Sequence, residues 1–140
     1  MAIFTGVVAF FAVRQNKLNK TMLKLEAYPK RLQIYDAMQK FVGEIMVFGS
    51  SNYKKALELL RETRHAKFLF DKDDNIEGYI ELFYKNAIDM VYQLKAINGE
   101  LGKIEEKKRK EIIDKNAELL KWFQNQLNVI DQKFKKYLQL

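Results

Sequence analysis

Residues 113–137, IDKNAELLKWFQNQLNVIDQKFKKY, contain the pattern that decides the fold. Seven apolar residues and one asparagine alternate there at spacings of three and four, which is the period of one helix face. They are Ile113, Asn116, Leu120, Phe123, Leu127, Ile130, Phe134 and Tyr137. A long helix in an antiparallel bundle explains this run of about three heptads as well as a coiled coil does, and Asn116 is suited to fix the register. We predict a long C-terminal helix over residues 104–137.

The composition favours helices along the whole chain. The 140 residues include one proline and six glycines, the two residue types that most often interrupt helices. Hydrophobic residues make up 48% and charged residues 31%, which is sufficient for one domain with a packed core. The chain has no cysteine and a single histidine, so a disulfide framework is excluded and a zinc site lacks its usual ligands.

Two shorter helices are predicted in the first half of the chain. The first spans about residues 29–48, where apolar residues recur at the helical spacing and Gly49 is a suitable C-terminal cap. The second runs from about Tyr53 to Phe68. At its end, Phe68, Leu69 and Phe70 form an apolar cluster, which we expect to pack beneath the following loop.

A further helix is predicted between residues 75 and 98. It follows the loop DKDDN at 71–75, and Asp74 with Glu77 three residues later forms a capping-box arrangement. Asn98-Gly99 is a typical terminator. Heptad spacing relates its apolar residues, Ile76, Ile80, Phe83, Ala87, Met90, Leu94 and Ile97. The predicted fold class is therefore all-α: an antiparallel helical bundle of four to five helices, with a long N-terminal helix and a long C-terminal helix.

The first thirteen residues, MAIFTGVVAFFAV, carry no charge. As a helix they would span about 20 Å, less than the bilayer core of about 30 Å, so we interpret them as the end of a membrane-spanning helix. The predicted membrane residues are Ile3, Phe4, Val7, Val8, Phe10, Phe11 and Val13. The predicted juxtamembrane basic residues are Arg14, Lys17, Lys20 and Lys24. By the positive-inside rule, these basic residues predict a cytoplasmic location for the domain that follows.

Other interpretations of residues 1–13 stay open. A secretory signal peptide would carry its charges before the apolar run, and a helix lying flat on a bilayer would be apolar on one side only. A buried core helix or a contact between two copies is compatible with the length. No helix breaker occurs between Val13 and Tyr28, and Pro29 is suited to open the next helix. We therefore divide the chain into a partial anchor helix with a basic extension, 1–28, and a helical bundle domain, 29–140.

The acidic loop resembles a calcium-binding loop only in part. Asp71, Asp73 and Asn75 fall at positions one, three and five of an EF-hand. Position six should be glycine and is Ile76, and position twelve should be glutamate and is Leu82. Without these two residues the calcium geometry fails, and we predict a solvated loop.

Two further features carry little chemistry. The basic run at 107–110 is flanked by glutamates, which is typical of charge pairing on a helix surface. The case for nucleic-acid binding is therefore weak, although the net charge is +7. His65 has only Glu62 as a possible partner for acid–base work. We assign no catalytic, cofactor-binding or metal-binding residues.

Three stretches resemble a known group of proteins. They are LKL at 23–25 with YxKRxxxY at 28–35, RxAKFLF at 64–70, and LLKWF at 119–123 with FxxYL at 134–138. In these stretches the chain is similar to a family of small uncharacterised bacterial proteins with one N-terminal membrane helix and a cytoplasmic helical domain. The likeness covers residues 14–140 and implies fold and placement, but no activity. The chain departs from it in the short apolar leader and in Pro29.

These patterns together predict a non-enzymatic, single-pass protein of the inner (cytoplasmic) membrane. Its helical domain would lie in the cytoplasm and would act as a scaffold or bind another protein. The expected partners are membrane lipid and a protein, which could be a second copy; no cofactor or small-molecule substrate is indicated. The alternatives are a soluble helical homo-oligomer that uses residues 1–13 as its interface and, with less support, a basic nucleic-acid-binding protein.

Overall fold

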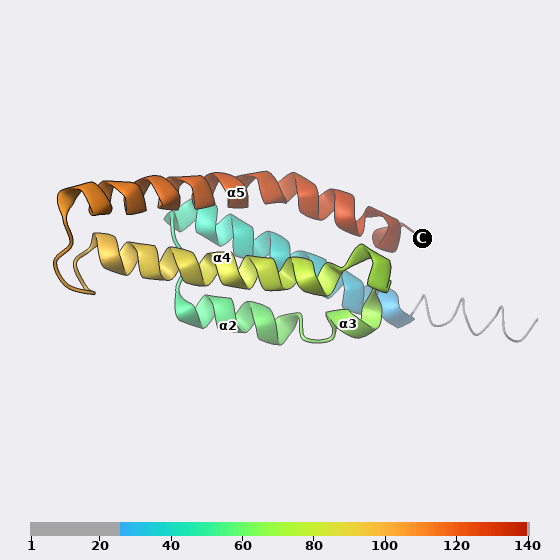
Figure 1. Cartoon of the computed structure of the whole chain (residues 1–140). Coiled ribbons are helices and arrows are strands. Elements are labelled where there is room, and N and C mark those ends of the chain that lie inside the picture. Colours follow the sequence, from blue (N-terminus) through green and yellow to red (C-terminus); the bar gives the residue numbers. More distant parts are fainter. Residues whose placement is uncertain (1–25, 140) are drawn as a thin grey trace, which may run out of the picture.

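The computed structural model describes residues 26–139, and all regular structure in this range is helical (Figure 1). Residues 26–48 form the first helix described. It is followed by α2 (Tyr53–Glu62), α3 (Ala66–Leu69), the 3-10 turn η1 (Lys72–Asp74), α4 (Ile76–Ile97) and α5 (Glu106–Leu138). The predicted all-α fold is confirmed.

The two longest helices, α4 and α5, pair in an antiparallel arrangement along their length. The hydroxyl of Tyr79, near the start of α4, donates to Gln126 Oε1 at 2.5 Å. At the end of α4, Ile97 O accepts a hydrogen bond of 3.3 Å from Arg109 Nε. The start of α4 therefore lies beside the later part of α5, and the end of α4 lies beside the start of α5.

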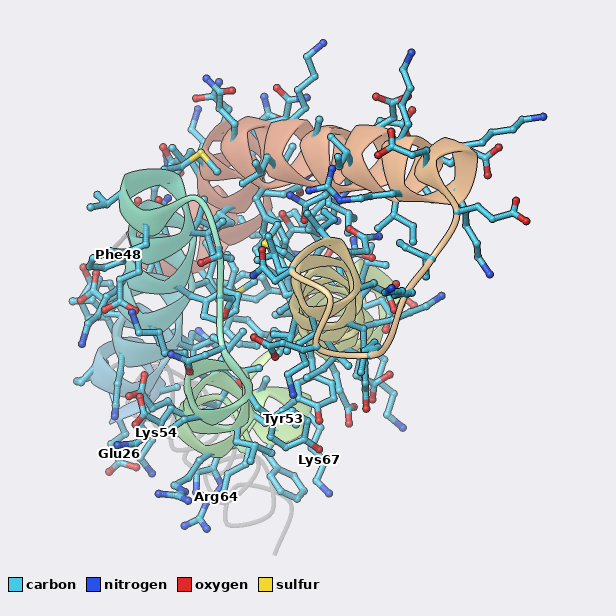
Figure 2. All side chains as sticks on the ribbon, turned by 90° about the vertical axis from the view of Figure 1, so that its left-hand side faces the viewer. Glu26, Phe48, Tyr53, Lys54, Arg64 and Lys67 are labelled. Atoms are coloured by element: carbon cyan, nitrogen blue, oxygen red, sulfur yellow. The ribbon has the colours of Figure 1, made fainter. Side chains whose placement is uncertain are left out.

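The 26–48 helix pairs with both α5 and α2. The hydroxyl of Tyr35 donates to Asp131 Oδ1 at 2.5 Å, and Gln39 Nε2 donates to Leu127 O at 3.3 Å, so this helix is also antiparallel to α5. Lys55 Nζ of α2 lies 3.5 Å from Glu44 Oε2. Seen along the bundle, the 26–48 helix lies between α5 and α2, and α4 completes the group (Figure 2). The predicted antiparallel bundle is confirmed.

Aromatic rings fill the centre of the bundle. Phe83 and Phe123 are fully buried, with ring centroids 5.7 Å apart. Phe41 of the 26–48 helix stands edge-on to Phe123 at 6.2 Å, and Trp122 contacts Phe83 at 5.2 Å. Side chains from three helices therefore meet at one level, as the heptad patterns predict.

The predicted continuous helix over residues 53–68 is wrong at Thr63. This threonine is buried, and its hydroxyl donates to Leu59 O at 2.6 Å. Its own carbonyl accepts from Ala66 N at 3.0 Å, which starts a tighter turn. The side-chain hydroxyl thus competes for a helix carbonyl where α2 ends, and α3 follows as a separate turn.

Two predicted boundaries also differ from the structure. Residues 26–28 belong to the same helix as residues 29–48, so Pro29 does not open it. Proline fixes φ near −65°, which is a helical value. The cap of α4 is Asn75 rather than Asp74: Asn75 has a left-handed φ of 47°, and its Oδ1 accepts from Gly78 N at 3.2 Å. Asparagine is among the few residues that tolerate this conformation.

The α4–α5 pair extends beyond the other helices at one end (Figure 1). Leu94 and Ile97 are only half-buried there, because the 26–48 helix and α2 do not reach this level. We call this end, with the 98–105 loop and the adjoining last turn of the 26–48 helix and first turn of α2, the far end. We call the opposite end, with residue 26, α3 and the last turn of α5, the near end.

Candidate functional site

The near end of the bundle is the candidate functional site. It brings together α3, the η1 loop, the last turn of α5 and residue 26 (Figure 1). These segments are far apart in the sequence. Residue 26 at this end follows directly after the predicted anchor and its basic residues. The arrangement of α3 decides which side chains this end exposes.

Contacts on three sides fix α3 to the bundle. Ala66 is buried, with 2% of its surface exposed. The carbonyl of Leu69 accepts a hydrogen bond of 2.7 Å from Arg31 Nε. The ring of Phe70 stands edge-on to Phe134 and Tyr137, with centroid distances of 5.2 and 4.8 Å. The backbone around residue 68 is therefore held in one orientation.

Phe68 is exposed over 75% of its surface. The prediction that Phe68, Leu69 and Phe70 all pack beneath the following loop is therefore wrong for Phe68. In a helical turn, Ala66 and Leu69 are three positions apart and share a face, whereas residue 68 points elsewhere. Ala56, Leu59, Thr63 and Ala66 are buried at spacings of three and four, so residue 68 lies outside the inward stripe that α2 and α3 share.

Two basic residues, Arg64 and Lys67, lie close to Phe68 in the sequence. Arg64 and Lys67 are exposed, and Figure 2 shows both side chains directed away from the bundle. Lys67 Nζ lies 5.0 Å from the centroid of the Phe68 ring, within the range of a cation–π contact. Among residues 26–139, neither Arg64 nor Lys67 forms an ion pair within 4.0 Å. Both line a small hollow of about 100 Å³ that Glu77 and Glu81 also border.

The acidic loop that follows α3 is engaged in structural contacts. Lys136 Nζ lies 2.6 Å from Asp74 Oδ2 and 3.3 Å from Asp71 Oδ2. The hydroxyl of Tyr137 donates to Asp74 and accepts from the backbone N–H of Asp71. Hydrogen bonds from Lys136 and then Tyr137 lower the pKa of Asp74, and the bond to Asp74 raises the pKa of Lys136. In the part of the chain that the structure describes, no three acidic, histidine or cysteine side chains are placed to hold a metal ion.

A second basic surface lies beside this loop. A hollow of about 340 Å³ lies on the surface between the start of α4 and the end of α5. Its lining residues are Asp74, Ile76, Gln132, Lys133, Lys135, Lys136 and Gln139. Lysines in the last turns of a helix complement its dipole, which is the ordinary explanation for them. These lysines nevertheless give the near end a second group of basic side chains, in addition to those close to Phe68.

The far end carries the other exposed apolar side chains of interest. Val47 and Phe48, in the last turn of the 26–48 helix, are exposed by 78% and 67%. Lys55 Nζ lies 4.6 Å from the centroid of the Phe48 ring. An open hollow of about 420 Å³ lies between the start of α2 and the end of α4. It is lined by Ser51, Asn52, Tyr53, Lys54, Val91, Leu94, Lys95, Asn98 and Glu100.

The residues that the sequence singled out as site residues lie outside the described range. The membrane residues are Ile3, Phe4, Val7, Val8, Phe10, Phe11 and Val13, and the basic residues are Arg14, Lys17, Lys20 and Lys24. Among residues 26–139, no helix combines the length and the apolar character needed to cross a bilayer. The predicted anchor therefore stays a prediction from residues 1–24.

Comparisons of the chain with protein-family models, with curated proteins and with solved structures find no match. The resemblance to bacterial proteins with one membrane helix accordingly stays a prediction.

Proposed function

We propose that this chain is a membrane-tethered helical domain that binds another protein on the cytoplasmic face of the inner membrane. One observation carries the proposal: an uncharged stretch at 1–13 is followed by Arg14, Lys17, Lys20 and Lys24, with no acidic residue before Glu26. An apolar helix prefers lipid to water, and basic residues near an anionic leaflet contribute about 1 kcal/mol each. The proposed role is binding, not catalysis.

In this proposal the near end faces the membrane, and the far end binds the protein partner. The near end holds residue 26, only two positions after Lys24, and it exposes cations around Phe68. The far end exposes Val47 and Phe48, and it also holds the open hollow between α2 and α4. Neighbouring exposed apolar side chains of this kind are typical of protein contacts. A partner bound at the far end would not compete with the bilayer for the same surface.

Membrane fractionation of the natural full-length protein tests the tether. We expect recovery in the membrane pellet, resistant to a high-salt wash because the apolar helix does not depend on charge. The double variant Val8→Lys with Phe10→Lys is expected to move the protein to the supernatant. The control Lys85→Gln with Lys121→Gln changes only surface charges of the bundle and should stay in the pellet.

Recovery of the unaltered protein in the soluble fraction would overturn the tether. Sedimentation of that soluble protein at several concentrations would then test the homo-oligomer: a dimer that is lost when Phe10 and Phe11 are changed to serine supports it.

Site-specific photocrosslinking tests the partner surface. A photoreactive residue at Phe48 is expected to give one adduct of defined mass in cells, whereas the same residue at the exposed Lys85 is expected to give none. Equal adducts at both positions would overturn a specific surface at the far end. An adduct with the mass of two copies would identify the partner as the chain itself.

A further inference from the structure

We propose that the α3 turn docks onto an anionic lipid surface, with the Phe68 ring among the headgroups and Arg64 and Lys67 against their phosphates. The inference rests on the proposed tether only for bringing the near end close to a bilayer. It adds a defined contact between the folded bundle and the membrane.

The first argument is the fixed outward direction of Phe68. An exposed aromatic ring in a frayed segment would not indicate a binding surface. Here, however, Ala66, Leu69 and Phe70 all contact the bundle. The ring is 75% exposed although Ala66 before it and Leu69 after it pack against the core. The fold therefore presents an apolar side chain at the surface, in a turn that has little freedom to turn it inward.

The second argument is the charge around the ring. Arg64 and Lys67 lie on the same turn, and Lys72 follows in η1, exposed as well. Among the nearby acidic residues, Asp71 and Asp74 contact Lys136, whereas Glu77 and Glu81 border the same hollow as Arg64 and Lys67. Aromatic rings and basic side chains together favour the headgroup region of an anionic bilayer, where a ring finds apolar surface and a cation finds phosphate.

The third argument is position. α3, which carries Phe68, lies toward the end of the bundle that holds residue 26, in line with α2 along one side (Figure 1). Nucleic-acid phosphates would satisfy Arg64 and Lys67 equally well, and the bases of a single strand can stack on an exposed ring. The proposed tether would bring this end of the bundle to a bilayer, which offers phosphates and apolar surface together, so lipid is the favoured ligand.

A single fluorescent reporter in the full chain tests this contact. Because the chain has no cysteine, His65→Cys can carry an environment-sensitive dye beside Phe68, and Asn98→Cys can carry it at the far end. The chain is reconstituted with vesicles of phosphatidylcholine alone, or with about one-third phosphatidylglycerol. We expect a blue shift at position 65 with the anionic vesicles only, and none at position 98 with either.

Substitutions in the reporter chain separate the ring from the charges. Phe68→Ser is expected to lower the docking equilibrium by about tenfold. Arg64→Gln with Lys67→Gln is expected to lower it by about fivefold for each charge removed. The control Lys85→Gln with Lys121→Gln removes the same charge elsewhere and should leave the shift unchanged. All of these residues are exposed, and circular dichroism verifies that each variant stays folded.

The outcomes distinguish docking from tethering. Co-sedimentation with both vesicle types without a shift at position 65 would overturn the docking and leave the tether intact. Co-sedimentation and a shift with anionic vesicles only would support the docking and overturn the apolar tether. No association with either vesicle would overturn both. A larger shift with single-stranded or duplex DNA than with anionic vesicles would overturn lipid as the ligand.

Discussion

The clearest prediction compares two phenylalanines that are two residues apart, Phe68 and Phe70. Replacing a fully buried phenylalanine with alanine costs about 3–5 kcal/mol. Phe70 is half-buried, which reduces that cost, but its ring stands edge-on to both Phe134 and Tyr137. Such aromatic pairs contribute about 0.5–1.5 kcal/mol each. We expect Phe70→Ala to lower the free energy of unfolding by about 2–3 kcal/mol.

Phe68→Ala is the matched substitution. Its ring is 75% exposed, so the expected change in unfolding free energy lies within about 0.5 kcal/mol. Urea unfolding of both variants in a mild detergent, followed by far-ultraviolet circular dichroism, measures the difference. Equal losses at the two positions would refute the described orientation of α3, and with it the argument that the fold directs Phe68 outward.

Three other predictions concern single contacts of the bundle. Asn52→Ala should cost about 1 kcal/mol in urea unfolding, because the Asn52 side chain accepts from Lys55 N at 2.8 Å as the cap of α2; Asn52→Ser should restore most of it. Tyr79→Phe should cost about 1–3 kcal/mol, since it leaves the buried Gln126 Oε1 without its donor, and adding Gln126→Leu should recover part of that loss in a double-mutant cycle. The pKa of Asp74 is lowered in the folded state by Lys136 and Tyr137, so its ionised form stabilises the fold above the ordinary pKa of 3.8, and this contribution is lost as the pH falls through the folded pKa. The free energy of unfolding of Asp74→Asn should therefore vary less with pH in acid than that of the unaltered chain, and identical pH profiles would contradict the Asp74 contacts.

The long helices could be predicted from the sequence because their period is set by burial. In α4, Ile76, Ile80, Phe83 and Met90 are buried at the predicted heptad positions, and α5 differs from its predicted bounds by only one or two residues. The last positions of the α4 pattern are less buried. The sequence pattern alone could not reveal this, because it does not state how far the neighbouring helices reach.

The short elements could not be predicted, since individual side-chain hydrogen bonds determine them. The helix ends at Thr63 because this residue is buried and donates to Leu59 O, and the sequence does not show either property. The same holds for the left-handed cap at Asn75, where Asp74 had the better sequence signal. Phe68 falls outside the buried positions 56, 59, 63 and 66, but three apolar residues in a row at 68–70 do not show from the sequence which of them points inward.

The length of α5 sets a distance between the two ends of the molecule. Its 33 residues run from the 98–105 loop to the near end, which corresponds to about 50 Å at 1.5 Å per residue. That exceeds the thickness of a whole bilayer with its headgroups, about 40–45 Å. A ligand held at the tip of the α4–α5 pair would thus stand well clear of any surface contacted by the opposite end, and shortening α5 by whole turns would bring it closer in steps of about 5 Å.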